Sequence, residues 1–358
     1  MSRKFFYIAG GFVALLIAAW FILNWLAPKK VEERLRTMLA QEGREVSIGS
    51  VHLHGINYLA LVISRKHVKI GGIELDRVRM EEGKQLTLEG DIAVDSILVD
   101  DMDKPMDSTN VHIGAVRLAL SHAVYAIPGA HAKVRLVNFM VDSRRRELRV
   151  DTIRLIPTVS KLELGGITGH QMDFVEATSS GVTVEGLDVM GLLQKHLVAE
   201  SITIRHSHIY VFRDRRLPLV TDVKPLPIGS LKSLPMSLRV GSVKLEGGSF
   251  TYEEFPKEGD KTGVLRIERL RVGIRHLINR PAAGDPDYVI VTSSGSLMGS
   301  GNVEAVMRMP LRKADPYKVE GAFHELDVTS LNPSAENLGG IHLESGMLNN
   351  LTFSFDMN

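Results

Sequence analysis

From Glu45 onward, apolar and polar residues alternate in short runs that are broken by Gly, Pro, Asp and Asn. Successive side chains of a strand point to opposite faces of a sheet, so this alternation is typical of strands with one buried face. The runs are also rich in Val, Ile, Leu and Thr, which favours β-structure. The clearest of them are residues 46–53, 86–99, 111–120, 148–156, 199–212, 238–252 and 265–274. We therefore predict that residues 45–358 form one mainly β domain, an elongated and curved antiparallel sheet with few short helices.

One strand form recurs along the chain: apolar residues at alternate positions, with Ser, Asp or Ala near the middle. It occurs at Val46–Leu53, Val111–Leu118, Leu148–Leu155 and Leu238–Leu245. The spacing between these copies is irregular, which argues against a tight solenoid repeat. The form indicates instead that one kind of strand is added repeatedly to a single extended sheet.

The last third of the chain predicts a three-stranded antiparallel meander. Residues 289–309 read as a strand, a Gly-rich turn and a second strand, and residues 319–332 read as a third strand. Within 238–252, the pair Gly247-Gly248 predicts a bulge or a turn. The best internal helix candidate is 187–197, a segment that could close an open end of the sheet.

The N-terminal segment predicts a membrane anchor. Residues 5–26 carry no charge and are long enough for a helix to cross a hydrocarbon core of about 30 Å. A cleaved signal peptide is the alternative, but its apolar region is usually about 7–15 residues long. We therefore predict a tail at 1–4, a transmembrane helix at 5–26 and a juxtamembrane helix at 27–44. The predicted anchor residues are Phe5, Phe6, Leu15, Leu16, Ile17, Trp20, Phe21 and Trp25.

Two questions about this segment stay open at the level of sequence. The apolar stripe of residues 31–42 fits a helix that caps the first strands or one that lies on the membrane surface. Lys29 and Lys30 follow the apolar stretch, and the count of Lys and Arg favours a cytoplasmic C-terminal domain. Long domains, however, cross membranes largely regardless of such charges, so the count does not decide the orientation.

Composition narrows the chemistry. The 43 basic and 42 acidic residues give a net charge of +1, which provides no general attraction for nucleic acid. The absence of cysteine excludes disulfides, thiolate metal sites and thiol nucleophiles. We find no catalytic motif and predict neither an enzyme nor a cofactor. The pairs His52-x-His54 and His206-x-His208 each supply two imidazoles, fewer than the three or four protein ligands of a zinc site. The run Arg144–Arg146 fits a solvated hairpin tip better than a membrane-headgroup contact.

Some strands are more apolar than a half-buried sheet requires. Two explanations fit: a closed two-layer core, or an open apolar face that receives a hydrophobic ligand. For the second, we predict a ligand-lining set by strand parity, namely Ile202, Ile204, Tyr210, Phe212, Phe250 and Tyr252.

The layout of the chain resembles the AsmA/TamB-like group of proteins. The similarity lies in the N-terminal anchor with VEERLRTMLAQEGREVSIGSVHL, in residues 186–214, and in residues 295–355 with their LDVTSLNP and SGML segments. In that group the strand pattern normally continues beyond a segment such as the final FSFDMN. These are strand and turn patterns rather than catalytic signatures, so no catalytic residue is carried over.

The resemblance implies an inner-membrane anchor with the β-domain in the periplasm, the opposite of the orientation that the charge count favours. It also implies a role in outer-membrane lipid homeostasis, with phospholipid acyl chains carried along an apolar β-groove. The expected partners are then the inner-membrane bilayer, phospholipid and envelope proteins. A membrane-anchored scaffold without a lipid ligand is the alternative.

Overall fold

The computed structural model describes residues 45–57, 60–101, 103–104, 110–219, 227–312 and 316–357. The predicted tail, transmembrane helix and juxtamembrane helix, with all eight anchor residues, lie outside these ranges. Within them, no helix combines the length and apolar character needed to cross a bilayer.

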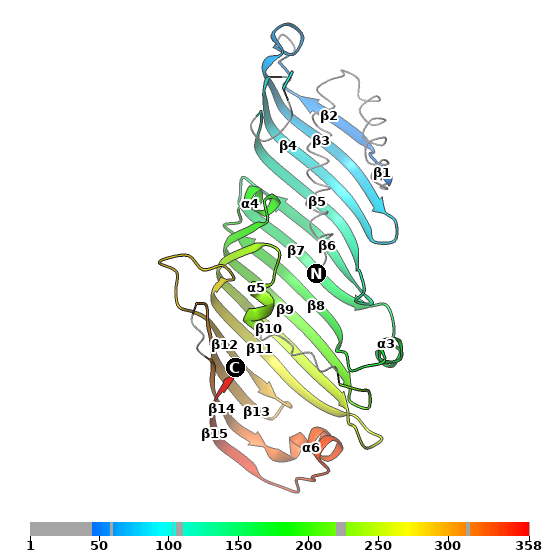
Figure 1. The fold of residues 1–358 in the computed structure, drawn as a ribbon, viewed down its shortest axis with the longest axis vertical. Helices are drawn as coiled ribbons and strands as arrows, with labels where there is room; N and C mark the ends of the chain where they lie inside the picture. The colour runs from blue at the N-terminus through cyan, green and yellow to red at the C-terminus, as the bar shows by residue number, and fades with distance from the viewer. Residues whose placement is uncertain are drawn as a thin grey trace. The chain divides into compact units, whose positions relative to one another are not determined.

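Strands dominate the described chain, and they are hydrogen-bonded in the order β1-β3-β4-β5-β6-β7-β8-β9-β10-β11-β12-β13-β14-β15, with β2 also on β3 (Figure 1). The mainly β, antiparallel architecture with few helices is therefore confirmed. The first strands are β1 (Glu45–Ser47), β2 (Ser50–His54), β3 (Lys66–Glu82), β4 (Leu86–Asp101), β5 (Val111–Ile127), β6 (Ala132–Asp142), β7 (Glu147–Pro157) and β8 (Phe174–Glu185). The others are β9 (His196–Asp214), β10 (Ser237–Phe255), β11 (Gly263–Ile278), β12 (Tyr288–Leu297), β13 (Gly301–Pro310), β14 (Tyr317–Asp327) and β15 (Met347–Met357).

The chain divides into two compact units. The first takes the described residues up to Pro128, Arg135–Asp151 and Glu185–His196. The second takes Gly129–Val134, Thr152–Val184 and the chain from Leu197 onward. Strands β6 and β7 contribute residues to both units.

The first unit has a filled apolar core on one face of β1–β5. Val68 and Val99 are fully buried and are paired across β3 and β4, and Ile70 and Ile97 repeat the arrangement two residues further along. Burying aliphatic side chains of this kind contributes about 1.5–3 kcal/mol each. The apolar face of this unit is therefore closed to solvent.

In the second unit, β12, β13, β14 and β15 form an antiparallel meander with regular register. Tyr288 pairs with Pro310 at one end of β12, and Leu297 pairs with Gly301 at the other. On the next pair of strands, Asn302 lies opposite His324. The meander predicted from residues 289–332 is confirmed.

Strands β9 and β10 are the exception to the antiparallel pattern. Residues further along β9 contact residues further along β10, so the two strands run parallel. His208 Nδ1 lies 2.5 Å from Ser249 Oγ, and the amide of Arg215 donates to the carbonyl of Phe255 at 3.0 Å. A Cβ on Gly241 would lie 2.7 Å from the carbonyl oxygen of Glu200. Parallel neighbours cannot be joined by a tight hairpin turn, and β9 and β10 are separated in the sequence by residues 215–236.

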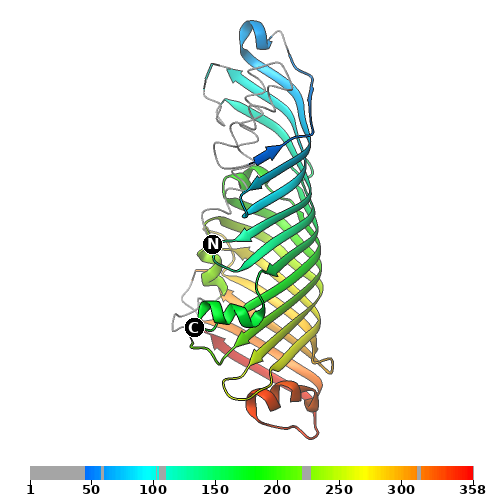
Figure 2. The same cartoon turned by 90° about the vertical axis from the view of Figure 1, so that its right-hand side faces the viewer.

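Few helices accompany the strands. They are η2 (Ala60–Ser64, a π-helix), α3 (Lys161–Thr168), α4 (Val189–Leu193), α5 (Pro227–Lys232), η3 (Val328–Leu331, a 3₁₀ helix) and α6 (Asn332–Gly339). Figure 2 shows α6 at the strand ends of the second unit, where Ser334 Oγ donates to the carbonyl of Val264 at 2.6 Å.

Two sequence predictions need correction. The helix predicted at 187–197 is only the five residues of α4, because His196 already begins β9. Asp188 starts this short helix by accepting a hydrogen bond from the amide of Gly191. The strand predicted at 46–53 is divided into β1 and β2 at Ile48-Gly49.

Candidate functional site: an apolar sheet face

Six consecutive strands of the second unit place one apolar side chain each in a single cross-strand row. Partners in such a row lie on the same face of a sheet. The row, which we call the apolar row, is Val243, Ile274, Val291, Met307, Val319 and Phe355. The face that carries it is called the apolar face below.

The neighbouring row, one residue along, belongs to the opposite face and is mostly polar. It consists of Ser242, Arg275, Ile290, Arg308, Lys318 and Asp356. Arg308 Nη1 donates to Glu320 at 2.6 Å, and Lys318 Nζ lies 2.9 Å from the same carboxylate. The two faces of β10–β15 therefore differ sharply in chemistry, and only one of them is suited to an apolar ligand.

The apolar face of the second unit is partly open, unlike that of the first. Val243, Ile274, Val291 and Met307 are each partly exposed, and Phe355 is 47% exposed. At the other end of the same strands, Leu231 of α5 packs over a buried cluster on this face. The cluster consists of Ile278, Val289, Met309, Leu311 and Tyr317.

Small residues occupy the middle of the apolar face. The next row on this face runs from Leu245 and Val272 through Ser293, Ala305 and Gly321 to Phe353. A Cβ on Gly321 would collide with the Phe353 ring, so glycine is what lets this ring lie down on the face. The rings of Phe323 and Phe353 lie 5.3 Å apart, and Phe353 stacks on Phe355 at 6.1 Å. These rings border the small residues on the β15 side.

Phe250 and Tyr252 of the predicted ligand-lining set lie on this apolar face. Phe250 pairs with Ile267, which pairs with Leu297, and Leu297 shares its face with Ser293 of the row above. Leu245 belongs to that row as well, so β10 shifts its alternation by one residue between Leu245 and Phe250. The bulge predicted at Gly247-Gly248 accounts for this shift.

Ile202 and Ile204 lie on the same face, but Tyr210 and Phe212 do not. Glu200 lies beside Gly241 and His208 lies beside Ser249, so β9 keeps one offset along β10 and shares its irregularity between Leu245 and Phe250. Ile204 precedes this irregularity and therefore points away from Glu246, to the apolar face. Beyond it, Tyr210 reaches Glu253 on the other face. The six predicted residues thus divide between the two faces.

Tyr210 and Phe212 pack beneath α3. Lys161, the first residue of that helix, donates to Tyr210 Oη at 3.1 Å and to Glu253 at 2.9 Å, and its Nζ lies 4.7 Å above the Phe212 ring. Burial alone lowers the pKa of Lys161, but the hydrogen bonds to Glu253 and Tyr210 outweigh burial, so the pKa is raised. Phe212 is only 1% exposed, so these residues anchor a helix and are closed to a ligand.

A hollow of about 1020 Å³ lies on the polar face of the same strands. Small residues such as Gly273, Thr292 and Ala322 form its floor, and Lys244, Arg271, Glu304 and Glu320 are among its charged borders. Charged residues of both signs border this hollow, and its lining also includes Leu245, Val272, Ser293, Ala305 and Gly321.

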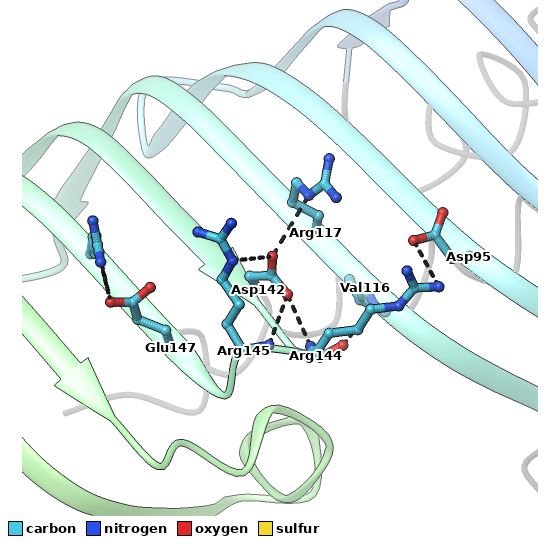
Figure 3. Close-up of polar contacts among 9 residues, drawn as sticks. Asp95, Val116, Arg117, Asp142, Arg144, Arg145 and Glu147 are labelled. Atoms are coloured by element: carbon cyan, nitrogen blue, oxygen red, sulfur yellow. Dashed lines mark hydrogen bonds and ion pairs between the residues drawn. The ribbon is translucent and has the colours of Figure 1, made fainter.

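The arginine run forms a hairpin tip with fixed partners, as Figure 3 shows. Asp142 Oδ1 accepts the backbone amides of Arg144 and Arg145 at 2.9 and 3.1 Å. The side chain of Arg144 reaches Asp95 at 3.4 Å, and Arg146 donates to the carbonyl of Gly186 at 3.0 Å. The predicted hairpin is confirmed, and these contacts hold the arginines in place within the first unit.

The paired histidines also have protein partners. His52 Nε2 lies 3.2 Å from Asp76, and His54 Nε2 lies 3.6 Å from Glu74, so each imidazole contacts a different carboxylate on β3. Within the described residues, no cluster of three or more potential metal ligands is found.

No protein-family model matches the sequence, and no solved structure matches the fold.

Proposed function

We propose that the apolar face of the second unit binds the acyl chains of phospholipids, and that the protein holds or transfers these lipids in the cell envelope. The observation that carries the proposal is the apolar row, in which six strands in succession present an apolar side chain on one face. The adjacent row of the other face contains Arg275, Arg308 and Lys318 at equivalent positions.

The energetics favour such a ligand. Moving hydrocarbon out of contact with water is worth about 0.8 kcal/mol per methylene. The small side chains of Ser293 and Ala305 would let an acyl chain lie against the middle of the face, beside the Phe353 ring that covers Gly321. A phospholipid headgroup would stay in water at the border, because burying a charged group costs free energy. Binding of this kind requires no covalent bond to be made or broken.

The setting of this activity rests on the N-terminal segment and on the resemblance to the AsmA/TamB-like group. A transmembrane helix at residues 5–26 would keep the apolar face beside a bilayer, from which a lipid could enter without crossing bulk water. We accordingly propose an inner-membrane protein with its β-structure in the periplasm and no enzymatic activity.

Two neighbouring residues of β12 provide a matched test. Val291 and Ile290 are both partly exposed aliphatic residues, but Val291 lies on the apolar face and Ile290 on the polar face. The photoreactive residue p-benzoylphenylalanine would be placed at each position of the full-length chain in cells, and lipid adducts would be identified by mass spectrometry after irradiation. We expect phospholipid adducts at position 291 and not at position 290.

A second pair of positions repeats the comparison, and a protease assay detects misfolded variants. Met307 and Val306 on β13 repeat the comparison, and each variant's protease resistance would be compared with that of the unmodified chain. Equal adducts from both faces of folded variants, or none from the apolar face, would overturn the proposal.

An envelope scaffold without a lipid is the second candidate, and the first unit favours it. Its apolar face is filled by its own side chains, with Val68 and Val99 fully buried. A lipid-free second unit that crosslinks to a protein through Val291 would support this alternative.

A further inference from the structure

Strand β15 forms one edge of the sheet that the structure describes. Among the strands that the structure describes, it is hydrogen-bonded to β14 alone. Its sequence, MLNNLTFSFDM, contains a single charged residue, Asp356, and neither Lys nor Pro. Proteins usually protect a sheet edge with such residues, because free amide and carbonyl groups invite another strand. Leu351 and Phe355 are each 47% exposed, so the edge is apolar as well as open.

The sequence of β15 is complementary to itself in one antiparallel register. When two copies are paired about a two-fold axis at Phe353, this ring meets the same ring of the second copy. Leu351 then lies opposite Phe355, and Thr352 lies opposite Ser354. At the next positions Asn350 meets Asp356, an amide that can donate to a carboxylate. From position 350 to 356, every apolar side chain therefore lies opposite an apolar one, and every polar side chain lies opposite a polar one.

Neighbouring registers lose this match. An axis at Thr352 places Phe355 opposite Asn349, and an axis at Leu351 places Phe353 opposite Asn349. An axis between two residues would set apolar side chains against polar ones along the whole strand, because side chains alternate between the faces. The single acidic residue gives no repulsion in the favoured register, because each Asp356 faces an amide.

We propose that two copies of this chain associate through their β15 strands, antiparallel and centred on Phe353. The proposal goes beyond lipid binding and does not depend on it. A two-fold axis perpendicular to the sheet keeps equivalent faces on the same side, so the apolar faces of the two copies become continuous. One strand pair is smaller than the roughly 1,200–2,000 Å² of a stable interface, so we expect a dimer that forms at high local concentration, as in a membrane.

The absence of cysteine in the sequence allows a direct test of the register. The full-length Thr352→Cys and Ser354→Cys chains, with tags of different size, would be purified in detergent and oxidised separately and together. Directly opposite residues of antiparallel strands have Cα atoms about 4.5–5.5 Å apart, close enough for a disulfide. We expect a mixed disulfide dimer from the two variants together, and much less crosslinking from either one alone.

A charge at the edge provides the second measurement. Ser354→Lys places two ammonium groups near the axis, and Glu320, which lies opposite Ser354 on β14, is already paired with Arg308 and Lys318. Thr292→Lys is the control, because Thr292 is an exposed hydroxyl residue of the same face in the sheet interior. In sedimentation experiments we expect Ser354→Lys to weaken dimerisation about tenfold, and Thr292→Lys to leave it unchanged. A monomer at all concentrations, crosslinks in another register, or crosslinks only to a different protein would overturn the proposal.

Discussion

Leu245 and Phe250 lie five positions apart on β10, yet their side chains lie on the same face of the sheet. Regular alternation would place them on opposite faces. The residues between them include Gly247 and Gly248, whose missing side chains allow the neighbouring strands to approach.

The two glycines are predicted to differ in tolerance. A Cβ on Gly248 would lie 2.8 Å from the backbone carbonyl oxygen of Ser207, whereas a Cβ on Gly247 would come no closer than 3.4 Å to any neighbour. We expect Gly248→Ala to destabilise the protein by about 1–3 kcal/mol, the usual cost of overpacking, because backbone cannot move aside cheaply. Gly247→Ala should stay within about 1 kcal/mol of the parent. Urea unfolding of the full chain measures both, and equal effects would contradict the assignment of the close contact.

The attachment of α3 should depend on Lys161. Its ammonium group contacts Glu253 and Tyr210, which are both half-buried or more, so Lys161→Ala leaves a carboxylate without its cation. We expect a loss of roughly 1–3 kcal/mol in the free energy of unfolding. Lys244→Ala is the matched control, since the Lys244–Glu246 pair is exposed and such pairs contribute about 0–1 kcal/mol. A similar effect of both substitutions would show that the buried cluster adds nothing.

Tyr252 should ionise at a higher pH than an ordinary tyrosine. Burial, and then the hydrogen bond from its hydroxyl to Glu254 at 2.6 Å, raise the pKa of Tyr252 to about 12. The neutral phenol is favoured in the folded protein, so its stabilising contribution is complete below the ordinary pKa near 10 and is lost as the pH rises toward 12. Alkaline titration of tyrosinate absorbance in the parent and in Tyr252→Phe should differ by one late-titrating group. A difference near pH 10 would contradict the burial described for Tyr252.

Asp285 should make folding sensitive to acid. Hydrogen bonds from Arg239 at 2.6 and 2.8 Å, followed by one from the amide of Ala282, lower the pKa of Asp285 well below its usual range. A lowered carboxyl pKa stabilises the fold above the ordinary value near 4, and that contribution is lost as the pH falls through the folded-state value.

The measurement for Asp285 is the melting temperature between neutral and acidic pH. Asp285→Asn should lower it at neutral pH and should make it less dependent on pH below about 4. Asp260→Asn is the control, because Asp260 is exposed in the turn between β10 and β11. The same dependence of the melting temperature on pH in Asp285→Asn and in the parent would show that the Asp285 carboxylate is not the source of the acid sensitivity.

The strands of this protein could be predicted from alternation because each apolar run, such as residues 86–99 or 265–274, has a face to bury. The face of an individual residue could not be predicted so well. Parity placed Ile204 and Tyr210 together, but the irregularity near Arg205 separates them. That irregularity has no glycine in β9 to signal it, and in β11 Arg269 adopts a positive φ of 50° without any marker in the sequence.

The pairing of strands that lie far apart in the chain could not be predicted from the sequence either. Local apolar spacing in residues 187–197 favoured a long helix, but pairing of β9 from His196 onward takes the second half of that segment. The parallel pairing of β9 with β10 joins strands that are separated by residues 215–236, and no local pattern encodes it. The rows that define the apolar face become visible only when the registers of six strands are known.

The parallel neighbours β9 and β10 also impose an order on folding. Hairpins such as β12–β13 close short loops and can form early, because little chain entropy is lost. Strand β10 can join β9 only by closing the intervening residues 215–236, which is a longer closure. We therefore expect the strands from β10 onward to assemble among themselves first and to dock on β9 last, so the seam between these two strands is the slow step in making the protein.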